Sequence, residues 1–139
     1  MEITEHYFKT LRHETFYLAA GNEDDPLIYL IHGWPDLSMG WMKQIGYLAE
    51  LGYRVIAPDM RGYGRSTIHP NHNDYCQKEI VKDMLELHAS FSTEKAIWIG
   101  HDWGSLVVWN LGLHHQEKVK ALGSLCVFLL VGAVILIVI

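Results

Sequence analysis

The stretch KAIWIGHDWGS, residues 95–105, decides how the fold of this chain is interpreted. Its apolar run at 96–99 has the composition of a buried parallel strand. A glycine-flanked turn follows this run, and residues 106–111 then carry apolar side chains at helical spacing. A strand, a tight turn and a helix in this order are typical of a nucleophile elbow, with Asp102 at the position where serine is more common.

The occurrence of glycine on either side of Asp102 has a physical explanation. A side chain raised on a sharp turn needs a strained backbone and a close approach of strand and helix, and Gly100 and Gly104 permit both. Asp102 would then stand at a helix N-terminus, where main-chain N–H groups favour the ionised carboxylate. A carboxylate held in this way is a nucleophile that needs no base to activate it. The alternative is that Asp102 only caps the helix, as aspartate often does.

Length and composition predict a single domain, because 139 residues of which 50% are hydrophobic can bury a core. The net charge of −5 argues against nucleic acid or an anionic membrane surface as a partner. Cys76 and Cys126 offer neither a disulfide framework nor a metal-ligand spacing. Residues 1–6 are polar and acidic, unlike a signal or transit peptide, so we expect a reducing, cytoplasmic location.

The rest of the chain alternates between strand and helix patterns. We expect two strands within 5–20, further strands at 27–31, 54–57 and 119–127, and helices at 39–51 and 75–91. This alternation predicts a mostly parallel sheet covered on both faces, a three-layer α/β sandwich. The glycine-rich loop at 61–66 lacks the spacing of a P-loop or a dinucleotide fingerprint, so nucleotide binding is not expected.

Two predicted strand ends carry residues that could meet in one site. The strand at 27–31 runs into HGWP, residues 32–35, and ligands bind at the carboxyl ends of parallel strands in open sheets. We therefore expect this loop to face Asp102, with the main-chain N–H groups of Trp34 and Trp103 as a pair of donors for negative charge. The residues expected to line the substrate pocket are His32, Gly33, Pro35 and His101.

Several of these residues have a second interpretation. The ring of His32 is more simply explained as a group that fixes its loop. The Trp34–Pro35 bond is a candidate for a cis peptide, since it lies in a tight loop. Trp34, Trp41 and Trp103 could line an apolar pocket or could be ordinary packing residues.

Three motifs follow one another in a specific order and spacing: HGWPD at 32–36, PDMRGYGRS at 58–66 and GHDWGS at 100–105. Together they resemble the α/β-hydrolase family, and more closely its epoxide hydrolase branch, over about residues 3–127. The resemblance implies that Asp102 attacks an epoxide carbon and forms an alkyl-enzyme ester. It further implies that the amides of Trp34 and Trp103 form the oxyanion hole when water attacks this ester and releases a diol. The implied partner is a small-molecule epoxide, and no cofactor or metal is implied.

The resemblance also implies parts that these residues do not supply. Family members use a late histidine base with a partner acid, and two tyrosines on a helical cap, and all of these lie beyond the matching region. We therefore expect an incomplete α/β-hydrolase core at 1–127, without cap or C-terminal strands, that forms the ester once at most. His69 and His72 could suggest a metal, but a solvated loop explains them better because no third ligand accompanies them.

Two other functions remain open. A haloalkane or haloacid dehalogenase would use the same aspartate to displace halide, although a tryptophan at position 34 favours epoxides. The chain could also be a non-catalytic fragment. Its apolar tail at 128–139 could be non-native, could be a strand or helix that covers the sheet, or could anchor the chain in a membrane through residues 122–139.

Overall fold

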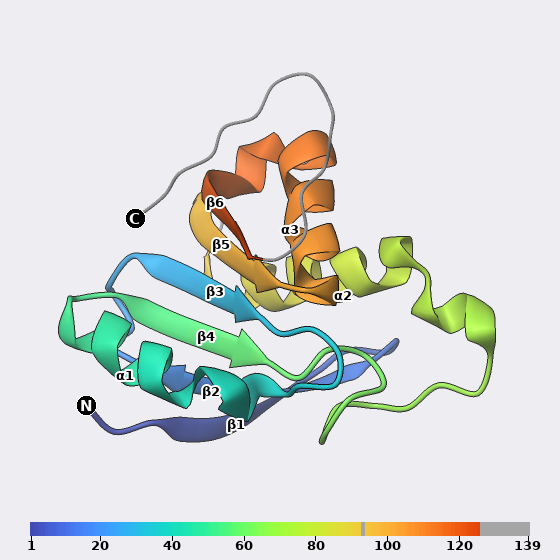
Figure 1. The fold of residues 1–139 in the computed structure, drawn as a ribbon, viewed down its shortest axis with the longest axis horizontal. Helices are drawn as coiled ribbons and strands as arrows, with labels where there is room; N and C mark the ends of the chain where they lie inside the picture. The colour runs from blue at the N-terminus through green and yellow to red at the C-terminus, as the bar shows by residue number, and fades with distance from the viewer. Residues whose placement is uncertain (93, 126–139) are drawn as a thin grey trace.

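The computed structural model describes residues 1–92 and 94–125. Six strands form one sheet in the order β1-β2-β4-β3-β5-β6 (Figure 1). The strands are β1 (Thr4–Lys9), β2 (Glu14–Ala20), β3 (Leu27–Ile31), β4 (Arg54–Pro58), β5 (Ala96–His101) and β6 (Val119–Leu125). The helices are α1 (Met42–Glu50), α2 (Gln77–Phe91) and α3 (Trp103–His114), with short 3-10 helices at Ser38–Trp41, His72–Tyr75 and Gln116–Lys118. The strands β4, β3, β5 and β6 are parallel, and β2 pairs antiparallel with both β1 and β4.

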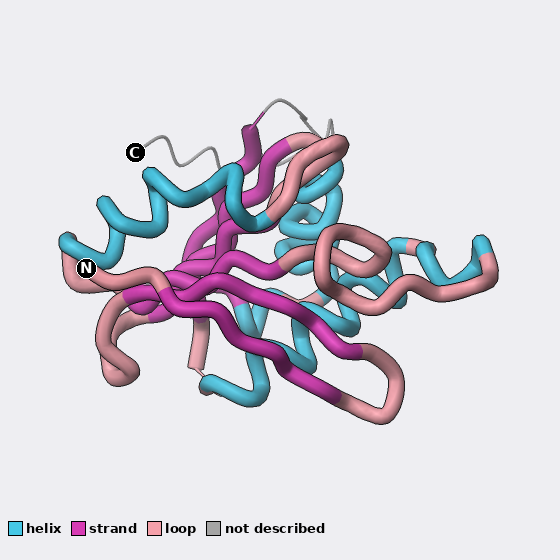
Figure 2. The backbone as a smooth tube through the Cα atoms, turned by 90° about the horizontal axis from the view of Figure 1, so that it is seen from below, coloured by secondary structure: helices cyan, strands magenta, loops and turns pink. Residues whose placement is uncertain are grey.

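The sheet carries a separate hydrophobic core on each face, as the side chains of β3 show. Ile28 and Leu30 pack in the core that contains Ile45 of α1. Tyr29 and Ile31 pack in the other core, to which α2 and α3 contribute. Alternate side chains of a strand point to opposite faces, so helices lie on either side of the strands (Figure 2). The predicted three-layer α/β sandwich with a mostly parallel sheet is confirmed.

The predicted strands at 27–31 and 54–57 are present, and the described part of the strand predicted at 119–127 is β6, but two predicted helices begin later than expected. The helix predicted at 39–51 starts as the 3-10 turn Ser38–Trp41 and becomes α-helical only at Met42. The helix predicted at 75–91 begins at Gln77, because Cys76 has an extended backbone with ψ of 154°. Before it, the side chains of Asn71 and Asp74 form a capping box that closes a separate turn at His72–Tyr75.

The first hairpin also differs in one residue. Leu11 lies within the region 5–20 predicted to hold two strands, but it is in the turn between β1 and β2 and is fully exposed. The turn closes when the Thr10 N–H donates to the His13 carbonyl at 2.9 Å. Leu11 has no neighbour to pack against in this tight turn, so its apolar side chain does not mark a strand position.

A buried group of charges fixes the loop after β4 to the rest of the fold. Asp83 of α2 accepts hydrogen bonds from Arg61 at 2.7 and 2.8 Å. Arg12, from the β1–β2 turn, donates to the same carboxylate at 2.5 Å. The Asp83 side chain has no exposed surface, so these two guanidinium groups compensate its charge. The cluster therefore joins the hairpin, the loop and α2.

The predictions for the end of the chain lie mostly outside the described residues. This applies to the apolar tail at 128–139, to the last two residues of the strand predicted at 119–127, and to most of the anchor considered at 122–139. Within residues 1–92 and 94–125, no helix combines the length and the apolar character that crossing a bilayer requires.

Candidate active site

Asp102 lies at the turn between β5 and α3, at the carboxyl end of the parallel strands. Its φ of 52° and ψ of −119° are in a region that a residue with a side chain occupies only when its surroundings impose it. An ordinary aspartate cap has an extended backbone, and its side chain accepts a hydrogen bond from the amide of the second or third residue of its own helix, which here would be Gly104 or Ser105. Asp102 has no such side-chain cap bond. The interpretation of Asp102 as a simple cap therefore does not account for its conformation.

Two glycines allow the loop after β3 to lie directly against this turn. A Cβ on Gly104 would lie 2.6 Å from the carbonyl oxygen of His32, so α3 packs here on bare backbone. A Cβ on Gly33 would lie 2.7 Å from Oδ2 of Asp102. Both distances are far below van der Waals contact, so a side chain at either position would separate the two loops.

The Asp102 carboxylate is held by main-chain amides. The N–H of Trp34 donates to Oδ2 of Asp102 at 3.0 Å. This bond and a second from the N–H of Trp103 lower the pKa of Asp102, and the nearby charge of His101 adds to the effect. Partial burial opposes them without cancelling them. The carboxylate is therefore ionised at neutral pH and has two donors aimed at it.

The ring of His32 fixes the loop that presents Trp34. His32 is fully buried, and its Nδ1 lies 2.9 Å from the carbonyl oxygen of Gly33. The N–H of Met60 donates to its Nε2 at 2.9 Å. Nε2 must therefore be the unprotonated nitrogen and Nδ1 the donor. Burial lowers the pKa of His32, which keeps the ring neutral.

Asp59 is a second group that holds the same loops, a role that the sequence did not predict. It is buried, and its carboxylate accepts the N–H of Ser38 at 2.8 Å and that of Arg65 at 3.1 Å. The hydroxyl of Ser66 donates to the Asp59 carbonyl at 2.6 Å. Asp59, Arg65 and Ser66 belong to the PDMRGYGRS motif, and the polar residues of this motif were the only signal in the sequence for their role.

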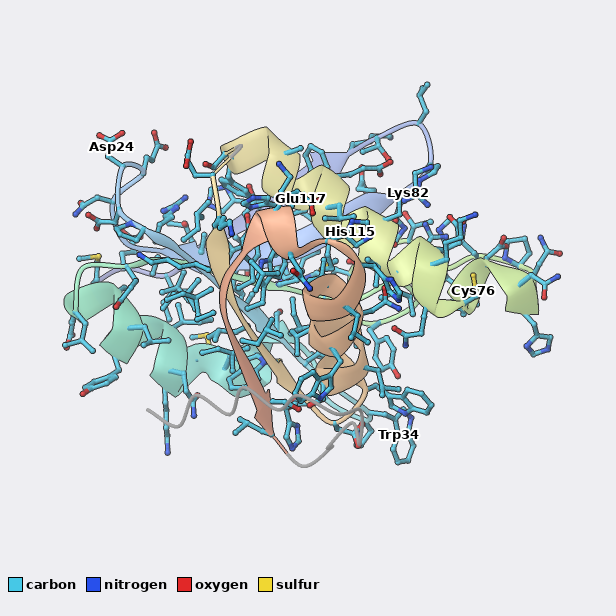
Figure 3. The ribbon with its side chains drawn as sticks, turned by 90° about the horizontal axis from the view of Figure 1, so that it is seen from above. Asp24, Trp34, Cys76, Lys82, His115 and Glu117 are labelled. Carbon is cyan, nitrogen blue, oxygen red and sulfur yellow. The ribbon has the colours of Figure 1, made fainter. Side chains whose placement is uncertain are left out.

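The two indoles beside Asp102 are exposed. Trp34 is 66% and Trp103 is 54% exposed, and Figure 3 shows Trp34 at the N-terminal end of α3. A cavity of about 220 Å³ adjoins Trp103. It is lined by Met60, Arg61, Tyr63, Tyr75, Gln77, Ile80, Trp103 and Val107. Trp41 is not part of this surface, because it packs in the core under α1.

The structure separates the predicted pocket residues into two groups. Gly33 contacts the Asp102 side chain, His101 is partly exposed at the end of β5, and Pro35 is exposed after a cis Trp34–Pro35 bond. The predicted cis peptide is thus confirmed. His32 does not line an open surface, because its ring is enclosed between the two loops it joins.

The histidines at 69 and 72 do not form a pair. His69 lies with Nε2 3.0 Å from Nδ1 of His13 in the β1–β2 hairpin, whereas His72 is exposed. No group of three or more side chains able to ligate a metal occurs in the part of the chain that the structure describes.

Comparison with known proteins assigns this architecture to a family. Residues 26–134 match the family described as alpha/beta hydrolase fold. Epoxide hydrolase A of Mycobacterium tuberculosis (strain ATCC 25618 / H37Rv) is 42% identical over 110 residues, which are 79% of this chain and 34% of that protein. The AB hydrolase superfamily protein YfhM of Bacillus subtilis (strain 168) is 46% identical over 104 residues, 75% of this chain and 36% of that protein.

A solved structure agrees with these sequence matches. The crystal structure of Epoxide Hydrolase A from Mycobacterium thermoresistibile superposes with a TM-score of 0.85 at 38% identity and covers 88% of this chain and 39% of that one. The chain spans about a third of the length of the two curated relatives, 34% and 36%. It belongs to the alpha/beta hydrolase fold family and, within that family, to the epoxide hydrolase branch.

Proposed function

We propose that Asp102 is the nucleophile of an epoxide-opening reaction on a small-molecule epoxide. Oδ2 of Asp102 is occupied by the Trp34 N–H, so Oδ1 is the oxygen that attacks. A bond forms between Oδ1 and an epoxide carbon while the ring C–O bond breaks. The electrons of that bond remain on the ring oxygen, which takes a proton from water. The product is a 2-hydroxyalkyl ester of Asp102.

One observation carries the proposal: Asp102 has a strained backbone with positive φ, and its carboxylate accepts a hydrogen bond from the Trp34 amide of a different loop rather than the cap bond from Gly104 or Ser105. Strain of this kind costs on the order of 1–3 kcal/mol and persists where the surroundings over-determine it. The lowered pKa of Asp102 supports the same role, because the ionised form is the nucleophile.

The same amides suit the second step of an epoxide hydrolase. In the ester, Oδ2 becomes the carbonyl oxygen and still faces the N–H of Trp34, and the N–H of Trp103, which also bonds the carboxylate, is the second donor of the proposed pair. When water attacks this carbonyl, negative charge develops on Oδ2, where fixed donors stabilise it. We propose this pair as the oxyanion hole, and His101 and Pro35 as rim residues of the substrate pocket.

Hydrolysis of the ester also needs a base for the attacking water. Among residues 1–92 and 94–125, no histidine ring is hydrogen-bonded to the Asp102 carboxylate, and the ring of His32 is used by its loop. We therefore propose that the ester accumulates on this chain instead of turning over.

The test is covalent labelling with a reactive aryl epoxide, read by peptide mass spectrometry. We expect one adduct, with the mass of the epoxide, on the peptide that contains Asp102. Hydroxylamine releases an ester but not a thioether, which separates this adduct from alkylation of the exposed Cys76. Asp102→Asn should abolish the ester, whereas Asp36→Asn should retain it, because Asp36 is an exposed carboxylate on the loop that carries Trp34.

Three outcomes would contradict the proposal in whole or in part. An adduct that persists in Asp102→Asn would show that another group is the nucleophile. Faster labelling by a haloalkane, with release of halide, would favour a dehalogenase instead. Sustained diol formation would support the nucleophile but contradict accumulation of the ester.

A further inference from the structure

Ser105 has no assigned role, although it lies three residues after Asp102 and has no exposed surface. Its hydroxyl lies 3.0 Å from the carbonyl oxygen of Gly100 and 3.0 Å from that of Leu125. A hydroxyl has one proton, so the two carbonyls share it. Gly100 is near the end of β5 and Leu125 is the last residue of β6, so this hydroxyl joins the ends of two parallel strands.

The same carbonyl of Leu125 also holds Asp102. The N–H of Asp102 donates to it at 3.1 Å, and the N–H of Ser105 donates to the Asp102 carbonyl at 2.9 Å. The main-chain N–H of Asp102 therefore shares an acceptor with the Ser105 hydroxyl, and the main-chain carbonyl of Asp102 is bonded by the Ser105 N–H. A residue with a side chain keeps a positive φ only when the surrounding contacts impose it. These hydrogen bonds are contacts of that kind for Asp102, whose φ is 52°.

We infer that Ser105 is a positioning residue for Asp102: its hydroxyl fixes the ends of β5 and β6 so that the Asp102 carboxylate stays opposite the amide of Trp34. This inference rests on the proposed role of Asp102 as the nucleophile. Ser105 does not contact the substrate; it acts by holding the backbone on which the nucleophile stands.

The test compares Ser105→Ala and Ser105→Cys with the wild-type chain. One readout is the pKa of Asp102, followed by the ¹³C shift of its carboxyl carbon. A second readout is the rate at which the aryl epoxide labels Asp102, divided by the fraction of folded protein, which a urea unfolding curve gives for each variant. In Ser105→Ala we expect the pKa of Asp102 to rise toward the ordinary value of about 3.9, because the two amides no longer converge on it.

Labelling of Ser105→Ala should slow by about tenfold or more, since misplaced reacting groups lose rate steeply. Ser105→Cys, whose thiol is a weaker donor of similar size, should give intermediate values for both readouts. Ser90→Ala is a control on another helix: the exposed Ser90 hydroxyl also donates to a carbonyl, that of Leu87 at 2.6 Å, but on α2. It should change neither readout.

Each result decides the question. A lower unfolding midpoint for Ser105→Ala, with an unchanged pKa of Asp102 and an unchanged labelling rate, would show a purely structural role and overturn the inference. If Ser105→Ala does not fold, an unchanged pKa in Ser105→Cys overturns it and an intermediate pKa supports it. If the wild-type chain is not labelled, the proposed function fails, yet the pKa comparison still tests whether Ser105 positions Asp102.

Discussion

Gly33 and Asp102 are in direct contact across the ends of β3 and β5, and a Cβ on Gly33 would overlap the Asp102 side chain. The two parallel strands pair along Ile28–Ile31 and Ile97–Gly100, so their ends are brought together by the sheet itself. The distance between the Trp34 amide and the carboxylate therefore depends on the absence of a side chain at position 33.

The first prediction is that Gly33→Ala disables the site with a moderate loss of stability. The added methyl group must push the loop away, which lengthens the 3.0 Å bond between the Trp34 N–H and Oδ2 of Asp102. A displacement of about 1 Å can cost on the order of 100-fold in rate, so labelling of Asp102 should fall by ten- to a hundredfold.

Gly46→Ala is the control for this variant. Gly46 lies in α1, and nothing is within 4 Å of the position that its Cβ would take. This change should leave labelling intact and stabilise the fold by about 0.5–1 kcal/mol, because alanine favours a helix. Unchanged labelling in Gly33→Ala would contradict the close packing described for the site.

The second prediction concerns His32, whose ring joins two loops. His32→Ala removes the acceptor of the Met60 N–H and leaves a buried amide unpaired beside a cavity. We expect a loss of about 2–4 kcal/mol in the free energy of unfolding. Because the loop also carries the Trp34 amide, the pKa of Asp102 should rise in the molecules that remain folded.

His88→Ala is the matched control, since His88 is equally buried and bonded, to Tyr29 at 3.1 Å and to the Glu94 carbonyl at 2.8 Å. It should cost comparable stability, measured by urea unfolding, and leave the pKa of Asp102 unchanged. A shift of the Asp102 pKa in both variants would mean that general loosening, not the loop, is responsible.

Local patterns in the sequence predicted the strand at 27–31 and the turn at Asp102, because each depends on neighbouring residues. The apolar run fixes the strand, and glycines at 100 and 104 permit the turn. The roles of Asp59 and Asp83 could not be predicted in the same way. Asp83 binds Arg12, which is 71 residues away, and such a pairing follows only from the assembled sheet and helices.

The third prediction tests this long-range cluster. Asp83→Asn removes the buried carboxylate that compensates the buried Arg61, whereas Arg12 keeps its ion pairs with Glu79 and Glu86. Breaking a buried ion pair in this way costs about 3–5 kcal/mol, which urea unfolding should detect. Glu5→Gln, which removes an exposed pair with Arg65, should shift the unfolding midpoint little. Equal effects of the two changes would contradict the importance of burial.

The fourth prediction is a loss of stability in mild acid that comes from His13. Burial lowers the pKa of His13 to about 4, although Asp83 opposes this effect; the charges of Arg61, His69 and Arg12 strengthen it. In the unfolded chain the ring has its ordinary pKa of about 6.5. Between these values the unfolded state binds the extra proton, so stability is complete above about pH 6.5 and falls as the pH decreases toward 4.

The size of this effect is at most about 3.5 kcal/mol, since the pKa of His13 is lowered from 6.5 to about 4 and each pKa unit corresponds to about 1.4 kcal/mol. Urea unfolding at pH 7, 5.5 and 4.5 measures it, and His13→Gln should flatten the dependence because the amide does not titrate. The variant also loses the contact with His69, so its stability at pH 7 should be lower than that of the wild-type chain. The two curves should therefore converge as the pH falls. If the two curves stay parallel from pH 7 to 4.5, other groups cause the loss of stability in acid, and protonation of His13 does not contribute to it.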